Sequence, residues 1–405
     1  MKSLLEYINE NFDNLLKLSK HDKDLLLQLD LEYHALKEEY SLEQVHFMNV
    51  TNSKDEIDRI EILINADKDF DIRLKYEKSK FKDDEWCKSL SDRLGKLSNK
   101  FNSINSFITK YYKGEISAML HKIEFLNAYE KDGTIKPEYD NLPPQYVYDE
   151  AIKILRETKY DNRENLPKEY DRVFTPEESQ KRLQKVIDKE GFGWKVIIDD
   201  NMIPRMSVRP YKQFRISSKC KFSEVDLQSL EIHEIKVHTA RKYWGLQSGL
   251  FLFMYGLPGS NIINEGIAIY NSLHKLEHPK PNILFYIAIK IVTRCKLAEC
   301  SPLETFKFLK SLTNASDRVL IYNMIRCSRV NGYNLMFSGS SDMHYLEGYM
   351  LVKDMSDKER DELIKYPIGP SQLFELETIK KFLSINKFKP LKYERSENED
   401  NKEIY

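Results

Sequence analysis

The chain has 405 residues, of which 41% are hydrophobic and 31% are charged. This length suits two or three domains, or one large domain with a substantial extension. The 63 basic residues nearly balance the 64 acidic ones, which argues against a nucleic-acid partner because dedicated binders usually carry a basic excess. Only 14 residues are glycine, about half the usual share, and no glycine-rich phosphate-binding motif is present. Nucleotide-binding folds built on such loops are therefore disfavoured, and a helix-rich chain is expected.

The cysteines and the apolar runs indicate the compartment. The five cysteines are an odd number and none forms a C-x-x-C pair, so neither structural disulfides nor a thiolate zinc site is expected. Residues 1–12 include two glutamates and do not resemble a secretory signal. The apolar runs at 250–257 and 283–289 are far shorter than the ~20 residues of a membrane helix. We therefore expect a cytoplasmic protein without a membrane partner.

The first predicted region is helical and covers residues 1–130. Its apolar residues recur at intervals of three and four, as in amphipathic helices, near 32–49, 81–111 and 115–130. Short strands are expected within 57–76. This helical N-terminal region would serve as a scaffold or hold a protein partner.

A helical connector is predicted over residues 131–190. Gly133, Pro143 and Pro144 mark turns and loops. A helix is expected at 148–159, and a second one begins at Thr175-Pro176, where a cap and a first-turn proline precede two acids. That second helix should end near residue 189.

The pattern changes at residue 191, where a core region reaching residue 392 begins. Strands are expected at 194–198, 205–209 and 213–217, forming a small antiparallel sheet. Ser223 and Asp226 then have the spacing of a capping box at the start of a helix that reaches about residue 243. A loop at 245–260 is followed by helices, predicted at 262–275, 281–297 and within 302–325. Residues 393–405 are polar and acidic, and are predicted to be a disordered tail.

The segment His233-Glu234-Ile235-Lys236-Val237-His238 holds the most informative motif, H-E-x-x-x-H. In the common H-E-x-x-H motif, histidines four apart bind zinc from one helix face and the glutamate acts as general base. Histidines five apart would point about 140° away from each other on a regular α-helix. They can share a metal only where the helix widens, as in a π-type bulge. Otherwise the two histidines are ordinary surface or core residues.

A third ligand would decide between these interpretations. Glu265, in the segment Asn264-Glu265-Gly266, stands 27 residues after His238, which is enough chain to bring a second helix against the first. A His₂Glu set with one open position is a known catalytic zinc site. A glutamate near a helix start is also favourable without a metal, because it complements the helix dipole.

Four segments, taken together and in this order, resemble one family. They are GWKVIIDDNMIPRMSV at 193–208, HEIKVHTAR at 233–241, YGLPG at 255–259 and NEGIA at 264–268. They resemble the microtubule-associated tyrosine carboxypeptidases, whose bacterial branch is labelled flavohemoglobin expression-modulating QEGLA-motif proteins. Arg326 and Arg329 fit the family motif R-x-x-R, and 342–348 fits D-x-x-Y-L-x-G. The resemblance covers about 115–350.

This resemblance implies a predominantly helical α+β fold with a gluzincin-like zinc metallopeptidase core at 191–392. It also implies one Zn²⁺ per chain, held by His233, His238 and Glu265, with Glu234 as the catalytic base. Tyr345 would steady the oxyanion. Arg326 and Arg329 are the first candidates to bind the carboxylate of a protein or peptide C-terminus, and Arg241 is the third.

The chain departs from the family at several positions. Lys236 and Val237 replace a glycine and a threonine inside the metal motif, Ser341 replaces a lysine, and Val330 replaces the glycine after R-x-x-R. The expected ligands are intact, so the departures concern substrate choice more than metal binding.

The sequence leaves more than one function open. The leading hypothesis is a zinc carboxypeptidase that removes a C-terminal aromatic, tyrosine-like residue. The alternatives are a non-catalytic or regulatory zinc-binding protein of the same fold that acts through partner binding, and an effector directed at another cell's proteins. Cleavage of C-terminal peptides by fully metallated protein would separate the enzyme from the binding protein.

Overall fold

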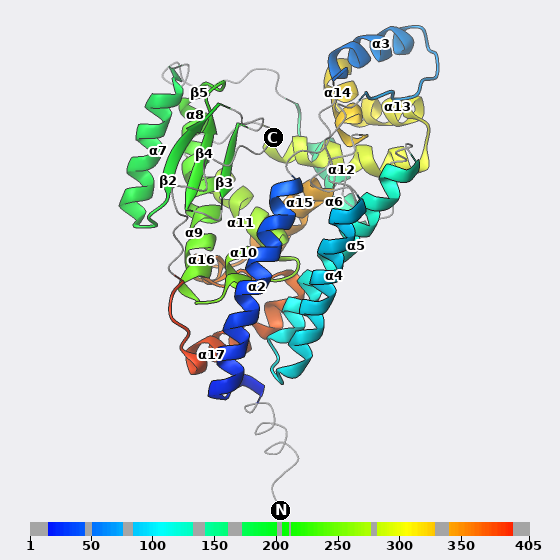
Figure 1. Cartoon of the computed structure of the whole chain (residues 1–405). Helices are drawn as coiled ribbons and strands as arrows, with labels where there is room; N and C mark the ends of the chain where they lie inside the picture. Colours follow the sequence, from blue (N-terminus) through cyan, green and yellow to red (C-terminus); the bar gives the residue numbers. More distant parts are fainter. Residues whose placement is uncertain are drawn as a thin grey trace, which may run out of the picture.

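The fold is predominantly helical α+β, as predicted, and it contains two small sheets (Figure 1). The computed structural model describes residues 15–44, 51–75, 84–132, 142–160, 172–200, 205–209, 212–276, 282–328 and 340–391. The predicted acidic tail at 393–405 lies outside these residues. No helix in the described ranges is long and apolar enough to cross a membrane.

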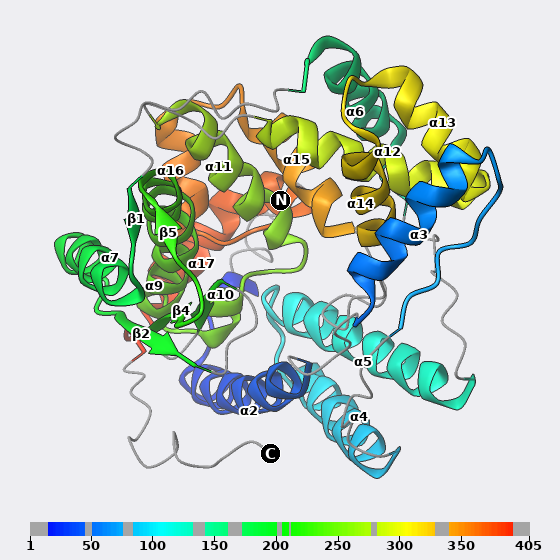
Figure 2. The same cartoon turned by 90° about the horizontal axis from the view of Figure 1, so that it is seen from above.

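The N-terminal region contains the helices α2 to α5 and one 3₁₀ turn. They are α2 (Lys20–Gln44), α3 (Ser53–Asn65), α4 (Asp84–Lys100), η1 (Phe101–Ser103) and α5 (Thr109–Asp132). Figures 1 and 2 show α2 running alongside α4 and α5, while α3 lies apart against α14. The predicted strands within 57–76 are wrong. Ile57 and Ile60 are buried at helical spacing and form one face of α3.

The connector contains α6 (Gln145–Glu157) and α7 (Pro176–Glu190), close to the predicted ranges. The capping signal before α7 is confirmed, because Thr175 and Glu178 form a reciprocal capping box with proline at the first helical position. The helix ends where Gly191 adopts a left-handed conformation, which costs glycine little.

The larger sheet contains β2 (Lys195–Asp199), β3 (Met206–Arg209) and β4 (Gln213–Ser217), in the order β2-β4-β3. The strands are where they were predicted, but the sheet is mixed. β3 and β4 are antiparallel, whereas β2 and β4 are parallel, so the expectation of a purely antiparallel sheet is wrong. Phe214 and Ile216 are fully buried, which explains why β4 takes the centre and the less buried β3 takes an edge. A second ladder joins β1 (Val173–Phe174) to β5 (Phe222–Ser223) and was not predicted.

The predicted helix after Ser223 consists of three consecutive segments. They are α8 (Glu224–Leu230), the π-helix η3 (Glu231–Thr239) and α9 (Ala240–Gln247). Ser223 and Asp226 form the predicted capping box. α10 (Phe251–Tyr255) lies inside the segment predicted to be a loop, where five apolar or aromatic residues form one short buried helix.

The remaining elements form the C-terminal half of the fold. They are α11 (Ser260–His274), α12 (Ile283–Glu299), α13 (Pro302–Leu312), α14 (Asp317–Cys327), α15 (Ser340–Val352), α16 (Asp357–Lys365), η5 (Pro370–Glu375) and α17 (Leu376–Asn386). Helix α11 packs closely against both η3 and α15.

One continuous core joins the N-terminal helices to the region around the π-helix. Tyr33 of α2 and Tyr112 of α5 belong to the same buried cluster as Phe214 of β4 and Val237 of η3. Helix α10 therefore packs directly on α2. The residue boundaries proposed for separate regions stay predictions.

Candidate functional site

The π-helix brings His233 and His238 together. In a π-helix the hydrogen bonds run from residue i to residue i+5, so side chains five apart lie one turn apart on the same face. The two imidazole rings accordingly lie 4.9 Å apart, centroid to centroid. The side chain of Thr239 donates a 3.0 Å hydrogen bond to the carbonyl of Glu234, the residue five positions earlier. Lys236, which replaces the family glycine, is exposed on the outer side of this helix and does not prevent the widening.

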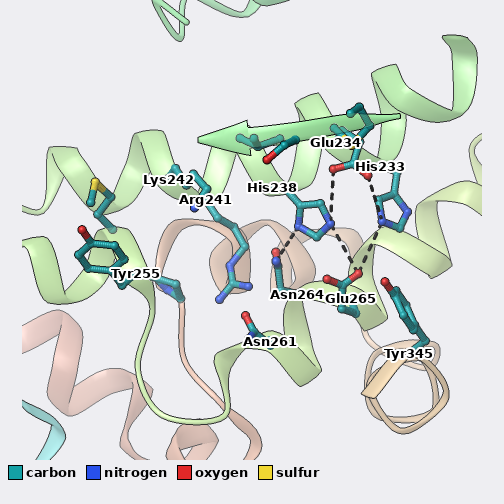
Figure 3. Close-up of a pocket in the computed structure, with 15 residues that line it drawn as sticks. His233, Glu234, His238, Arg241, Lys242, Tyr255, Asn261, Asn264, Glu265 and Tyr345 are labelled. Carbon is teal, nitrogen blue, oxygen red and sulfur yellow. Dashed lines mark hydrogen bonds and ion pairs between the residues drawn. The ribbon is translucent and has the colours of Figure 1, made fainter. Parts of the chain in front are cut away.

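Helix α11 supplies Glu265 as the third donor. Its Oε2 atom lies 3.6 Å from Nε2 of His233 and 3.5 Å from Nε2 of His238. One ligand atom from each of the three residues lies within 4.8 Å of the other two. Figure 3 shows the three side chains converging on one point. The structure therefore brings the three predicted metal ligands together.

The same helix also orients both imidazoles. The Oγ atom of Ser272 lies 3.4 Å from Nδ1 of His233, and the side-chain amide of Asn264 lies 2.6 Å from Nδ1 of His238. A metal at Nε2 requires the proton on Nδ1, and a half-turn of the Asn264 amide brings its Oδ1 atom, which has no hydrogen-bond partner, to accept that proton. Helix α11 thus supplies the third donor, Glu265, and the two residues that contact the histidines, Asn264 and Ser272.

The donor set and its electrostatics fit a divalent metal. The Oε2 atom of Glu265 is buried and makes no hydrogen bond. Burial alone would raise the pKa of Glu265, but the facing histidines hold it well below its ordinary value. Burial opposes protonation of His238, yet the carboxylates of Glu265 and Glu234 raise its pKa to about 9. The site thus favours a positive charge between the imidazoles, and two nitrogens with one carboxylate oxygen match catalytic zinc sites.

Glu234 faces the same point from the π-helix. Its carboxylate oxygens lie 3.8 Å from Nε2 of His233 and 3.9 Å from Nε2 of His238. It is therefore in position to exchange a proton with a molecule held between the histidines and Glu265.

The three donors lie at one end of a pocket of about 310 Å³. Arg241, one turn beyond His238, lines this pocket and is only 5% exposed. Its Nη1 atom donates a 3.2 Å hydrogen bond to the carbonyl of Ser260, whereas its Nε and Nη2 atoms are buried with no hydrogen-bond partner. Burial lowers the pKa of Arg241 to about 9, partly offset by Glu265. An unpaired buried guanidinium is costly, so the pocket is suited to an anion.

Tyr345 reaches the pocket from α15, and its hydroxyl end points toward Glu265 (Figure 3). Of the other two arginine candidates, only Arg326 belongs to the described residues, and the structure does not bring it together with the site. Arg326 is exposed on α14 and is not among the described residues that line the pocket. Arg329 lies outside the described residues. Of the two described candidates for the carboxylate site, Arg241 lines the pocket and Arg326 does not.

Two residues of the site, Lys242 in the pocket and Ser272 beside His233, were not predicted from the sequence. Lys242 lines the pocket and stands four residues after His238, a spacing that would have suggested it. Ser272 follows Glu265 by seven residues, two helical turns, so helical periodicity could also have identified it. Met206, Ser207 and Val208 also line the pocket, and they belong to the strand that the sequence predicts at 205–209.

A family match extends over most of the chain. The family model described as microtubule-associated tyrosine carboxypeptidase matches residues 74–404. The match begins earlier and ends later than the resemblance at 115–350, so it includes α4, α5 and the predicted tail. No curated protein matches the chain. Because the family model covers most of the sequence, including η3, α11 and α15, the chain belongs to the microtubule-associated tyrosine carboxypeptidase family.

Proposed function

We propose that this protein is a zinc-dependent carboxypeptidase with a gluzincin-like core that releases one C-terminal, tyrosine-like residue from a protein or peptide. The observation that carries the proposal is the juxtaposition of two features in one pocket. Three converging donors, His233, His238 and Glu265, lie at one end, and the buried unpaired Arg241 lies one helical turn away. The family membership agrees with this activity.

His233, His238 and Glu265 would hold the single metal ion. When bound there, Zn²⁺ would supply a Lewis acid for a carbonyl oxygen and lower the pKa of a water molecule. Glu234 would take a proton from the attacking water on its carboxylate and pass that proton to the leaving amine. The hydroxyl of Tyr345 would donate a hydrogen bond to the oxyanion that develops on the scissile carbonyl.

Arg241 would bind the terminal carboxylate of the substrate. A guanidinium offers parallel N–H donors that match the two oxygens of a carboxylate, and its Nε and Nη2 atoms have no other partner. Arg241 lies about 4.5 Å further along the helix than His238, because each residue adds about 1.5 Å. One residue of an extended peptide spans about 3.3 Å. A carboxylate-binding group so near the proposed metal ligands favours release of a single residue over cleavage within a chain.

The strand β3 would hold the substrate residues that precede the scissile bond. β3 pairs only with β4 among the described strands, and Met206, Ser207 and Val208 line the pocket. An extended peptide can add to such an edge through main-chain hydrogen bonds. A protein partner on the N-terminal helices, a cytoplasmic location and the absence of nucleic-acid and membrane partners stay predictions from composition.

Metal analysis of purified protein tests the proposed ligand set. We expect one zinc per chain in the wild type and a loss of zinc in His233→Ala and Glu265→Ala. Glu234→Gln is the matched control, since it should keep zinc and lose turnover. Unchanged zinc content in His233→Ala or Glu265→Ala would refute the ligand assignment.

A further inference from the structure

The pocket contains a second cation that the proposed mechanism does not use. Lys242 follows Arg241 on α9 and lines the same pocket. Its side chain is half-buried, and no hydrogen bond or ion pair joins its ammonium group to another described residue. In Figure 3, Lys242 and Tyr255 lie on the side of Arg241 away from the metal ligands. The lysine is therefore available to a ligand that extends past Arg241.

The surroundings of Lys242 are electropositive. Burial lowers its pKa to about 8, and Arg241, Arg209 and Lys37 act in the same direction against the single opposing carboxylate of Glu38. Lys37 is itself paired with Glu115 at 2.9 Å. A hydrogen-bond acceptor that reaches this end of the pocket would thus meet a desolvated donor, where hydrogen bonds to charged groups are strongest.

The walls of this end of the pocket suit an aromatic ring. They are formed by the buried side chains of Met254 and Pro367 and by the ring of Tyr255. The hydroxyl of Tyr255 is already engaged, because it donates to Glu38 and lies 2.7 Å from Nδ1 of His34. Residues of α2 therefore hold the ring of Tyr255 in place. Lys242 is then the polar group that a bound side chain would contact.

We infer that Lys242 donates a hydrogen bond to the phenolic oxygen of the released residue and so makes the pocket prefer tyrosine to phenylalanine. This inference rests on the proposed function. The carboxylate of that residue would lie on Arg241, and its ring would lie against Met254, Tyr255 and Pro367. A pocket without Lys242 would still accept the ring but could not distinguish the two aromatic residues.

Binding measurements test the role of Lys242 separately from turnover. The zinc-loaded Glu234→Gln protein and its Lys242→Met and Lys242→Arg double variants are titrated with three peptides identical except for a C-terminal Tyr, Phe or Glu. Methionine removes the ammonium group and keeps the length of the chain. We expect Lys242→Met to weaken binding of the Tyr peptide at least about tenfold and to leave the Phe peptide unchanged. Lys242→Arg should restore most of the preference.

The outcomes that would overturn the inference are distinct. Equal losses for the Tyr and Phe peptides, or no loss for either, would show that Lys242 does not contact the phenol. A Glu peptide that binds most tightly and depends most on Lys242 would assign the lysine to an acidic side chain instead. Failure of the proposed function would be seen elsewhere, as intact peptides after incubation with the zinc-loaded wild type.

Discussion

Gly266 of α11 and Gly348 of α15 meet where the two helices cross, and their backbones touch. A Cβ atom on Gly266 would lie 2.1 Å from the carbonyl carbon of Gly348, and one on Gly348 would lie 1.9 Å from the carbonyl oxygen of Ile262. The crossing stands directly beside the site, since Glu265 precedes Gly266 and Tyr345 lies one turn before Gly348. These two glycines therefore set how closely Tyr345 approaches Glu265 and the two histidines of the candidate site.

Alanine at either crossing position should separate the two helices. We expect Gly348→Ala and Gly266→Ala to lower the free energy of unfolding by about 1–3 kcal/mol, because backbone atoms cannot move aside as a flexible side chain can. Chemical denaturation measures this change. Gly95→Ala is the matched control, since a Cβ atom on Gly95 of α4 would meet nothing within 4 Å, and alanine there should stabilise by about 0.5–1 kcal/mol. If Gly348→Ala were as stable as the wild type, the contact between the two helices would not be tight.

The contact between Asn264 and His238 should affect zinc affinity. Asn264→Leu removes the partner of His238 Nδ1 and should weaken zinc binding about 10–100-fold, measured by competition with a chelator. Asn264→Asp keeps an acceptor and should retain most of the affinity. Asn261→Leu is the control, because Asn261 lines the pocket from the same helix but is exposed. Equal losses in Asn264→Leu and Asn261→Leu would argue against a specific role for Asn264.

Substitution of Arg241 and substitution of Arg326 should affect activity differently. Arg241→Met should lower kcat/KM for a peptide with a free C-terminus by a hundredfold or more, since a buried carboxylate without its partner costs about 2–5 kcal/mol. The same change should raise the free energy of unfolding, because it removes a buried cation whose Nε and Nη2 atoms are unpartnered. Arg326→Gln should leave kcat/KM unchanged, because Arg326 does not line the pocket. Loss of activity in Arg326→Gln with full activity in Arg241→Met would restore the original assignment from the family motif.

Two titrating groups between α2 and α10 predict opposite pH dependence. His34 stacks on Phe251, and burial lowers its pKa from 6.5 to about 4, so the unfolded chain binds its proton more readily. Its contribution to stability is present above pH 6.5 and is lost as the pH falls toward 4. We expect the stability difference between wild type and His34→Asn to shrink by about 2 kcal/mol between pH 7.5 and pH 5.

Asp30 provides the matched comparison. It accepts hydrogen bonds from the backbone N–H groups of Phe251 and Leu252, but burial raises its pKa from 3.8 to about 6. The folded state therefore binds this proton more readily, and the contribution of Asp30 is lost as the pH rises through 6. As the pH falls from 7.5 to 5, the free energy of unfolding of the wild type should rise by about 1 kcal/mol relative to that of Asp30→Asn. Parallel pH profiles for the two variants would contradict both assignments.

The geometry of the candidate site could be predicted in part from the sequence because its signals are local. The spacing of His233 and His238 required a widened helix, and the structure has a π-helix at Glu231–Thr239. The sequence also predicted the helix caps at Thr175 and Ser223 and the positions of three strands. Each of these features depends on residues that are neighbours in the sequence.

The remaining features depend on contacts between distant segments. The parallel pairing of β2 with β4 follows from which strand is most buried, which the alternation of residues alone does not reveal. Helix α10 was missed because its first N–H groups are capped by Asp30, more than 200 residues earlier in the chain. The preference for Arg241 over Arg326 required the pocket itself, since the sequence placed Arg326 and Arg329 ahead of Arg241.

Mass spectrometry of one peptide ending in tyrosine tests the central claim most directly. The zinc-loaded wild type should remove a single tyrosine from the free-carboxylate peptide and leave its amidated form intact, and Glu234→Gln with equal zinc content should leave both intact. Equal tyrosine release by Glu234→Gln, cleavage inside the peptide, or an unchanged peptide after incubation with fully metallated wild type would contradict the account.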